Sequence, residues 1–206
     1  ATEQDLIRKM VGRDVLIERK NIQTQFQNTI LKVDNLNLIN PNNKKRKLLH
    51  DISFELKKGE ILGIFGLMGA GRTELLETLF GMHPANSQYN LEIDKKNTFH
   101  KKPKEAIENG LAFVTEDRKT EGLILGMDIS SNISLTSLPT FGILNPSKDK
   151  QSSKDYIEKL RIKTPSETQL CQNLSGGNQQ KVVLAKWLAT NPQILMMDEP
   201  TRGIDI

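Results

Sequence analysis

Apolar and polar residues follow two different periods along this chain, and the first of them predicts strands. Residues 52–56 alternate apolar and polar side chains, as in a strand with one buried face. Leu31, Val33 and Leu36 make a short strand-like stretch. Three mainly apolar runs, 61–65, 111–115 and 194–197, are typical of strands buried on both faces of a parallel sheet.

Helical spacing appears between these strands. One helix carries three leucines on a single face and ends at Gly81. Further helices are predicted at 103–109, at about 155–160 and from Ser175 to about 190, where Ser175 is a candidate N-terminal cap. Strands that alternate with helices predict an α/β fold with a mainly parallel core sheet.

Composition agrees with one globular domain. The chain has 206 residues, 36% hydrophobic and 26% charged. No run reaches the roughly 18 apolar residues that would span a bilayer. The single cysteine, Cys171, excludes an internal disulfide. The net charge of +4 comes largely from two short runs, 44–47 and 101–102, which are more typical of solvated loops than of a nucleic-acid surface.

The aromatic and imidazole side chains offer no separate site. Trp187 shares the apolar face of its predicted helix, so we expect it in the core. The three histidines, His50, His83 and His100, have no carboxylate or cysteine partner at metal-binding spacing. We expect them at the surface or in loops.

The strongest chemical signal is a glycine-rich turn, GLMGAGRT at 66–73, between a predicted strand and a helix. Glycines let backbone N–H groups converge on an anion, and the start of a helix adds its dipole. A threonine hydroxyl at this place can bind Mg²⁺. The candidate nucleotide-binding residues are Gly66, Gly69, Ala70, Gly71, Arg72 and Thr73.

An acidic pair ends the last predicted strand. Asp198 and Glu199 follow the apolar run 194–197, at the edge of the sheet where ligands bind in α/β proteins. Asp198 can hold Mg²⁺ through water, and Glu199 can polarise an attacking water as the catalytic base. Acidic pairs at strand ends are common. This pair indicates a nucleotide site only because it occurs together with the glycine-rich turn.

A second glycine-backed helix start is the most specific motif. The segment LSGGNQ offers a serine hydroxyl and backbone N–H groups to a phosphate. Its residues are Leu174, Ser175, Gly176, Gly177, Asn178 and Gln179.

Taken in this order, the three motifs resemble the ATP-binding domains of ABC transporters over about residues 29–206. The resemblance implies a P-loop ATPase fold with an N-terminal antiparallel β portion and a helical subdomain at about 117–174. It implies ATP and Mg²⁺ as cofactors. It also implies head-to-tail pairing, in which each nucleotide lies between one domain's glycine-rich loop and the other's LSGGNQ segment. Asp205 matches the aspartate of the family's D-loop.

The exact residues of the motifs resemble the second ATP-binding domain of monosaccharide importers of the ribose and xylose type. They are GLMGAGRTE, TEDRK at 115–119, LSGGNQQK and DEPTRGID. Residues 1–28 then look like a linker from a preceding ATPase domain. The implied partners are that first domain or a second copy, the transmembrane permease subunits and, indirectly, an external sugar-binding protein, with no nucleic acid. The implied location is the cytoplasmic face of the bacterial inner membrane.

The sequence departs from the general family pattern in four places. Arg72 stands where the pattern has lysine, and Glu116 stands at the Q-loop position. No aromatic residue lies between about 37 and 48, where an adenine-stacking side chain usually falls. The chain also stops at Ile206, before the family's switch region and last strands, so we expect hydrolysis in the intact protein.

Three functions remain open at this point. The first is an ATPase domain that drives sugar import. The second is a degenerate, non-hydrolytic domain that completes the ATP site of its partner, favoured by Arg72, Glu116 and the missing aromatic residue. The third is an ABC protein acting on ribosomes or DNA. It is disfavoured because the residues of the motifs resemble those of sugar importers.

Overall fold

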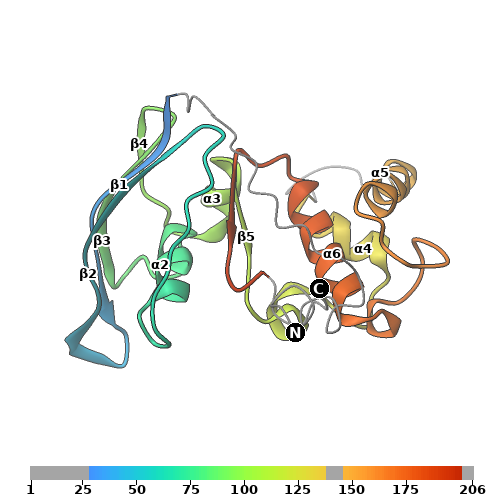
Figure 1. Ribbon diagram of the computed structural model, residues 1–206, viewed down its shortest axis with the longest axis horizontal. Coiled ribbons are helices and arrows are strands. Elements are labelled where there is room, and N and C mark those ends of the chain that lie inside the picture. The colour runs from blue at the N-terminus through green and yellow to red at the C-terminus, as the bar shows by residue number, and fades with distance from the viewer. Residues whose placement is uncertain (1–27, 138–145, 201–206) are drawn as a thin grey trace, which may run out of the picture.

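The computed structural model describes residues 28–137 and 146–200 and arranges them in layers (Figure 1). The strands are β1 (Thr29–Asn40), β2 (Asn43–Lys57), β3 (Ser87–Ile93), β4 (Lys96–Thr98), β5 (Leu111–Val114) and β6 (Ile194–Met197). The helices are α2 (Arg72–Leu79), α3 (Pro103–Glu108), α4 (Ile129–Ser134), α5 (Pro146–Lys159) and α6 (Gly176–Leu188), with short turns η1 (Arg118–Gly122) and η2 (Cys171–Asn173). The predicted linker at 1–28 lies almost wholly outside the described residues, and Asp205 lies outside them.

An antiparallel sheet of order β2-β1-β3-β4 forms one layer. It confirms the predicted strands at 31–36 and 52–56, since both lie within the β1–β2 pair, where Val33 is opposite Phe54. The loop expected around the basic run 44–47 is wrong, because β2 already begins at Asn43. The exposed side chains of this run project from the far end of a long hairpin, where no apolar alternation marks a strand.

Helix α2 lies between this sheet and a second, parallel sheet of β5 and β6 (Figure 1). Leu75 and Leu79 of α2 are buried, as their helical spacing predicts. All four residues of β5 are buried, which confirms the predicted strand at 111–115. Trp187 of α6 is also in the core, with its ring centroid 5.5 Å from that of Phe80.

Helices α4, α5 and α6 pack together on the other side of β5 and β6. Asn132 connects the segments beneath them: its Oδ1 accepts from the N–H of Ile124, and its Nδ2 donates to the carbonyl of Ile124 and to Cys171 Sγ. The helix predicted at 155–160 lies in α5, which begins earlier than expected. Within the described part of the range 117–174, α4, α5, η1 and η2 are joined by non-helical segments.

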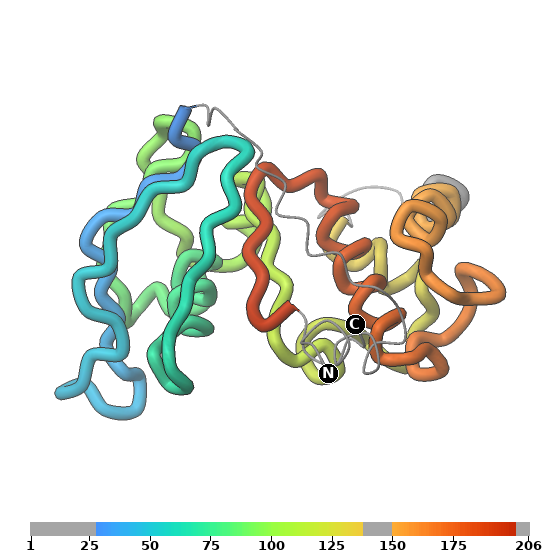
Figure 2. The backbone as a smooth tube through the Cα atoms, in the orientation of Figure 1, coloured from blue at the N-terminus to red at the C-terminus, as the bar shows by residue number. Residues whose placement is uncertain are grey.

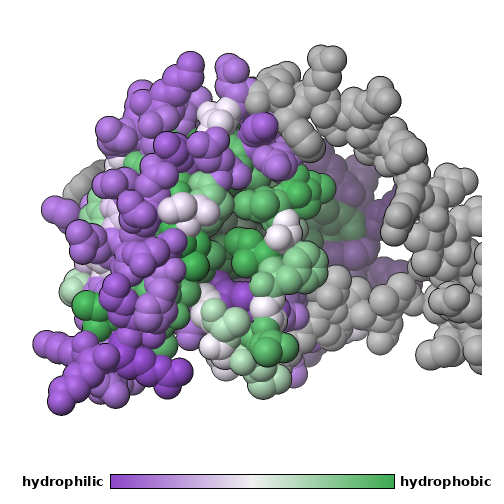
Figure 3. Space-filling model, turned by 60° about the vertical axis from the view of Figure 1, so that its left-hand side comes forward, coloured by the Kyte–Doolittle hydropathy of each residue, from purple (hydrophilic) through white to green (hydrophobic). Residues whose placement is uncertain are grey.

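The apolar run 61–65 differs from its prediction. It is not a strand, and Ile61 and Phe65 are 96% and 94% exposed. In Figure 2 it belongs to the teal tube between the four-stranded sheet and β6. A cavity of about 1050 Å³ separates it from β6, and Figure 3 shows apolar side chains around a hollow on this side. Within the described residues no strand fills this space, so the run has no neighbour for its backbone hydrogen bonds.

The same cavity explains a smaller difference at β6. Ile194 and Met196 are buried as expected, but Met197 is 45% exposed because β6 has a strand neighbour, β5, on one side only. Within residues 28–137 and 146–200, no helix combines the length and apolar character needed to cross a bilayer.

Candidate nucleotide-binding site

The start of α2 is built for close approach of the backbone. Gly71 precedes the helix with φ +88°, a left-handed conformation that side chains disfavour. A Cβ at Gly71 would lie 2.6 Å from Leu49 Cδ2, so there is no room for one. No side chain of the described residues caps α2. Its first backbone N–H groups have no intrahelical acceptor and remain available to an anion.

The turn before α2 is equally compact. The N–H of Ala70 donates to the carbonyl of Leu67 at 3.0 Å, and Gly69 within this turn has φ +78°. A glycine at the third position suits the positive φ of such a turn. The glycine positions of the predicted loop therefore match backbone geometry that needs them at Gly69 and Gly71.

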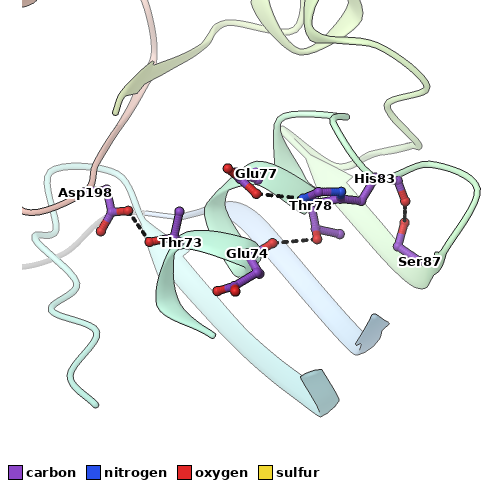
Figure 4. A network of polar contacts seen from close by, with 7 residues as sticks. All are labelled: Thr73, Glu74, Glu77, Thr78, His83, Ser87 and Asp198. Carbon is purple, nitrogen blue, oxygen red and sulfur yellow. Dashed lines mark hydrogen bonds and ion pairs between the residues drawn. The ribbon is translucent and has the colours of Figure 1, made fainter. Parts of the chain in front are cut away.

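Two polar pairs join this loop to the end of β6. Thr73 Oγ1 donates to Asp198 Oδ2 at 2.5 Å, the contact drawn at the left of Figure 4. Arg72 Nη1 lies 3.0 Å from Glu199 Oε1. Four of the predicted residues, separated by about 125 positions in the chain, thus meet at one place.

The parallel sheet positions the acidic pair. Met197 is opposite Val114 in the β5–β6 pairing, and the N–H of Asp198 then donates to the Val114 carbonyl at 2.9 Å. This bond holds the nearly buried Asp198 against α2. Glu199 has φ +43°, a strained conformation for a residue other than glycine, and such strain concentrates at functional sites.

A smaller cavity of about 200 Å³ lies beside Thr73. It is lined by Thr73, Glu77, Phe113, Thr115, Glu116, Asp117 and Glu121, so the predicted Q-loop residue Glu116 does share a space with Thr73. Glu77 was not anticipated, although it follows Thr73 by one helical turn. It also pairs with His83 at 2.7 Å (Figure 4).

The LSGGNQ segment lies elsewhere. Ser175 precedes α6, and α6 is on the opposite side of β5 and β6 from α2 (Figure 1). The structure therefore does not bring Ser175 to the Arg72–Glu199 pair. Gln179 points into the protein: it is buried, and its Nε2 donates to the Cys171 carbonyl at 3.0 Å. Leu174 is half-buried against the core.

Lys186 is a residue that the sequence analysis missed. Its side chain is only 7% exposed, and its Nζ donates to the Gly122 carbonyl at 2.5 Å. It therefore joins α6 to η1, the turn that follows Glu116. Burial lowers the pKa of Lys186 to about 8. The sequence offered one signal for this residue: Lys186 stands among the apolar positions of the helix predicted from Ser175 to about 190.

The residues present fit a magnesium nucleotide. The open start of α2, with Gly71 pressed against Leu49, leaves backbone amides for phosphate oxygens. Arg72 supplies positive charge, and the paired Thr73 and Asp198 are oxygen donors of the kind Mg²⁺ prefers. The buried hydroxyl of Thr115, in the adjacent cavity, has no hydrogen-bond partner within the described residues.

Solved structures share this fold. A nucleotide-free ATP-binding cassette of an ABC transporter matches with a TM-score of 0.70 and 22% identity, covering 86% of this chain and 71% of that one. An ATP-binding cassette solved as a dimer in a post-hydrolysis state with ADP and Pi matches with a TM-score of 0.72 and 22% identity, covering 85% and 76%. The predicted P-loop ATPase fold of the ABC type is confirmed.

Curated relatives are nearer in sequence. The ribose import ATP-binding protein of Rhodopirellula baltica is 48% identical over 98% of this chain, and the xylose import ATP-binding protein of Moorella thermoacetica is 44% identical over 100% of it. The chain spans only 40% and 41% of their lengths.

A match to the family described as ABC transporter covers residues 49–202. That range contains the loop before α2, the acidic pair after β6 and the LSGGNQ segment. This chain therefore belongs to the ABC transporter ATP-binding family.

Proposed function

We propose that this chain binds and hydrolyses Mg-ATP as one ATPase domain of a longer polypeptide that drives import of a simple sugar. The observation that carries the proposal is the convergence of Arg72, Thr73, Asp198 and Glu199 at the open start of α2. A phosphate-binding helix start, two oxygen donors and a carboxylate base are the parts that phosphoryl transfer to water requires.

Each residue has a distinct role in this proposal. The first amides of α2 and the Arg72 guanidinium would bind the phosphates, and Thr73 and Asp198 would hold Mg²⁺ in part through water. Bound Mg²⁺ neutralises charge on the phosphate oxygens. Glu199 orients the attacking water and accepts its proton once the nucleotide has displaced it from Arg72.

The substrate and the partners follow from the relatives. Proteins named for ribose and for xylose import match nearly all of this chain, which supports a monosaccharide as cargo. The chain spans about 40% of their lengths, which leaves room for another domain of this size. The residues of its motifs support the second of two ATPase domains, with residues 1–28 as the linker. The assembly would include permease subunits and work at the cytoplasmic face of the bacterial inner membrane, with an external sugar-binding protein.

A second ATPase domain would complete the site. Helix α6, which Ser175 precedes, lies on the opposite side of β5 and β6 from α2 (Figure 1), so a phosphate bound at α2 does not reach the Ser175 of the same chain. In the proposed pairing Ser175 and the start of α6 contact the nucleotide of the other domain, and the other domain supplies the equivalent group here.

The alternative function is a non-hydrolytic domain that only completes its partner's site. Arg72 in place of lysine and Glu116 at the Q-loop position favour it. The experiment measures ATP turnover by the full-length protein with each site disabled in turn. If turnover with only this site intact equals that with both disabled, the hydrolytic proposal fails and the alternative stands.

A further inference from the structure

The amide of Asn178 makes two hydrogen bonds that determine its orientation. Its Oδ1 accepts from the backbone N–H of Lys163 at 2.9 Å, and its Nδ2 donates to Ser175 Oγ at 3.0 Å. A backbone N–H can only donate, so the atom that faces Lys163 must be the amide oxygen. The NH₂ group therefore faces Ser175, and the serine hydroxyl must accept.

This contact determines where the hydroxyl proton of Ser175 can point. A hydroxyl has one proton to donate, and here one of its acceptor positions is occupied by Asn178. Its proton is therefore directed away from the amide. Ser175 is exposed, so this proton remains available to solvent or to a ligand that approaches the start of α6.

The same contact changes how α6 begins. A serine at the N-cap usually accepts from a backbone N–H two or three positions ahead. Ser175 occupies the cap position but makes no such bond. The first bond of the helix runs from the N–H of Gln179 to the Ser175 carbonyl. The N–H groups of Gly176, Gly177 and Asn178 are thus not occupied by the serine side chain.

The loop that carries Lys163, the donor to Asn178 Oδ1, is attached to the helices around it. Lys163 follows Ile162, which is 5% exposed and whose N–H donates to the Ile157 carbonyl at 2.9 Å. Lys181 of α6 also donates from Nζ to the Arg161 carbonyl at 2.8 Å. The loop that holds Asn178 is therefore attached both to α5 and to α6.

We propose that Asn178 is a positioning residue: it directs the Ser175 hydroxyl outward as a donor and keeps the first amides of α6 open for the terminal phosphate of ATP bound to the other ATPase domain. This inference rests on the proposed function. An asparagine suits the role because it can accept from Lys163 and donate to Ser175 at once, which neither alanine nor aspartate can do.

The test measures vanadate trapping of ATP at the other domain's site in the full-length protein with its permease. Ser175→Ala should reduce trapping markedly. Asn178→Ala should reduce it roughly 3- to 10-fold, as expected for loss of one orienting hydrogen bond. Asn178→Asp keeps the Lys163 contact but accepts from Ser175, which turns the hydroxyl inward and adds negative charge, so we expect a loss of roughly 100-fold.

The double variant Ser175→Ala/Asn178→Ala separates positioning from general damage. If Asn178 acts through the serine, the double variant should trap as Ser175→Ala alone does. Lys181→Met is the matched control for general loosening of this loop, because it removes the contact with Arg161 but leaves both hydrogen bonds of Asn178 and the attachment through Ile162 in place. It should leave trapping within about twofold of wild type, as is usual for a surface substitution.

The outcomes distinguish this inference from the proposed function. If Ser175→Ala has no effect at the other site, the head-to-tail arrangement is wrong and the inference falls with it. If Ser175→Ala reduces trapping but Asn178→Ala does not, only the positioning role is overturned. A full additive loss in the double variant, or an equal loss in Lys181→Met, would also overturn it.

Discussion

The guanidinium of Arg72 and the carboxylate of Glu199 form an ion pair, with Nη1 and Oε1 3.0 Å apart. The two side chains are 34% and 41% exposed, so the pair contributes no more than about 0–1 kcal/mol. A nucleotide triphosphate carries far more charge than one carboxylate. A bound nucleotide could therefore displace Glu199 from Arg72 at little cost, which would release the carboxylate for its proposed role as a base.

Replacement of Arg72 should separate binding from turnover. Arg72→Ala removes the only charge of the loop, and we expect ATP affinity to fall roughly tenfold or more. Arg72→Lys keeps the charge on a compact ammonium, which should raise turnover at this site if the wide guanidinium is poorly aimed. Equilibrium binding and single-site turnover in the full-length protein measure the two effects. Unchanged ATP affinity in Arg72→Ala would contradict the proposed contact.

Glu199→Gln should slow hydrolysis and spare binding. The amide cannot accept a proton from water, and loss of a general base typically costs about 10²–10⁴-fold in rate. ATP affinity should stay near wild type, because the carboxylate acts on water and not on the phosphates. Rapid-quench turnover and equilibrium binding test this together. Collapse of affinity with normal turnover per bound ATP would make Glu199 a binding residue instead.

Gly71→Ala should damage the loop through contact as well as conformation. The new Cβ would lie 2.6 Å from Leu49 Cδ2 and 3.4 Å from the Leu48 carbonyl oxygen, at φ +88°. The left-handed conformation costs about 1–2 kcal/mol, and overpacking adds about 1–3 kcal/mol. Denaturant unfolding measures the stability loss, and ATP affinity should fall with it.

Gly59→Ala is the control for this prediction. Gly59 has nearly the same conformation, φ +82°, but nothing lies within 4 Å of its would-be Cβ. It should show the conformational cost alone and keep ATP affinity. Equal effects of the two substitutions would mean that the crowding at Gly71 is unimportant.

The sequence predicted elements best where the pattern of one segment decides its structure. The helix at Pro103 has clear end signals, and the strand predicted at 111–115 is uniformly buried over Leu111–Val114. The strand predicted at 61–65 is wrong, because its own pattern does not decide its structure. Its composition predicts burial, but burial needs a neighbouring strand, and none is present among the described residues. A local pattern cannot supply that neighbour.

His100 shows the same limit for a polar residue. Expected at the surface, it is fully buried, with Nδ1 2.6 Å from the Leu79 carbonyl oxygen and Nε2 3.1 Å from Asn109 Nδ2. Burial lowers its pKa, so the ring is neutral and structural. Within the site, the motifs predicted which residues converge, but the bond between Asn178 and Ser175 depends on Lys163, which belongs to no motif.

The last prediction concerns the buried ammonium of Lys186. Its pKa is lowered from 10.5 in the unfolded chain to about 8 in the folded protein because burial disfavours the charged form. At pH values between these two pKa values, the unfolded chain binds more protons than the folded protein. The contribution of Lys186 to the unfolding free energy must therefore rise with pH.

The comparison is between wild type and Lys186→Met, which keeps the apolar stem and removes the titrating group. We expect the unfolding free energy of wild type, relative to that of Lys186→Met, to increase by about 1–3 kcal/mol from pH 8 to pH 10. Each pKa unit corresponds to about 1.4 kcal/mol. Lys181→Met is the control, because Lys181 lies on the same helix and also donates to a carbonyl but is less buried; it should show no such gain. Parallel pH dependence in all three proteins would mean that Lys186 is as accessible to water in the folded protein as Lys181, and that its bond to the Gly122 carbonyl does not hold a buried charge between α6 and η1.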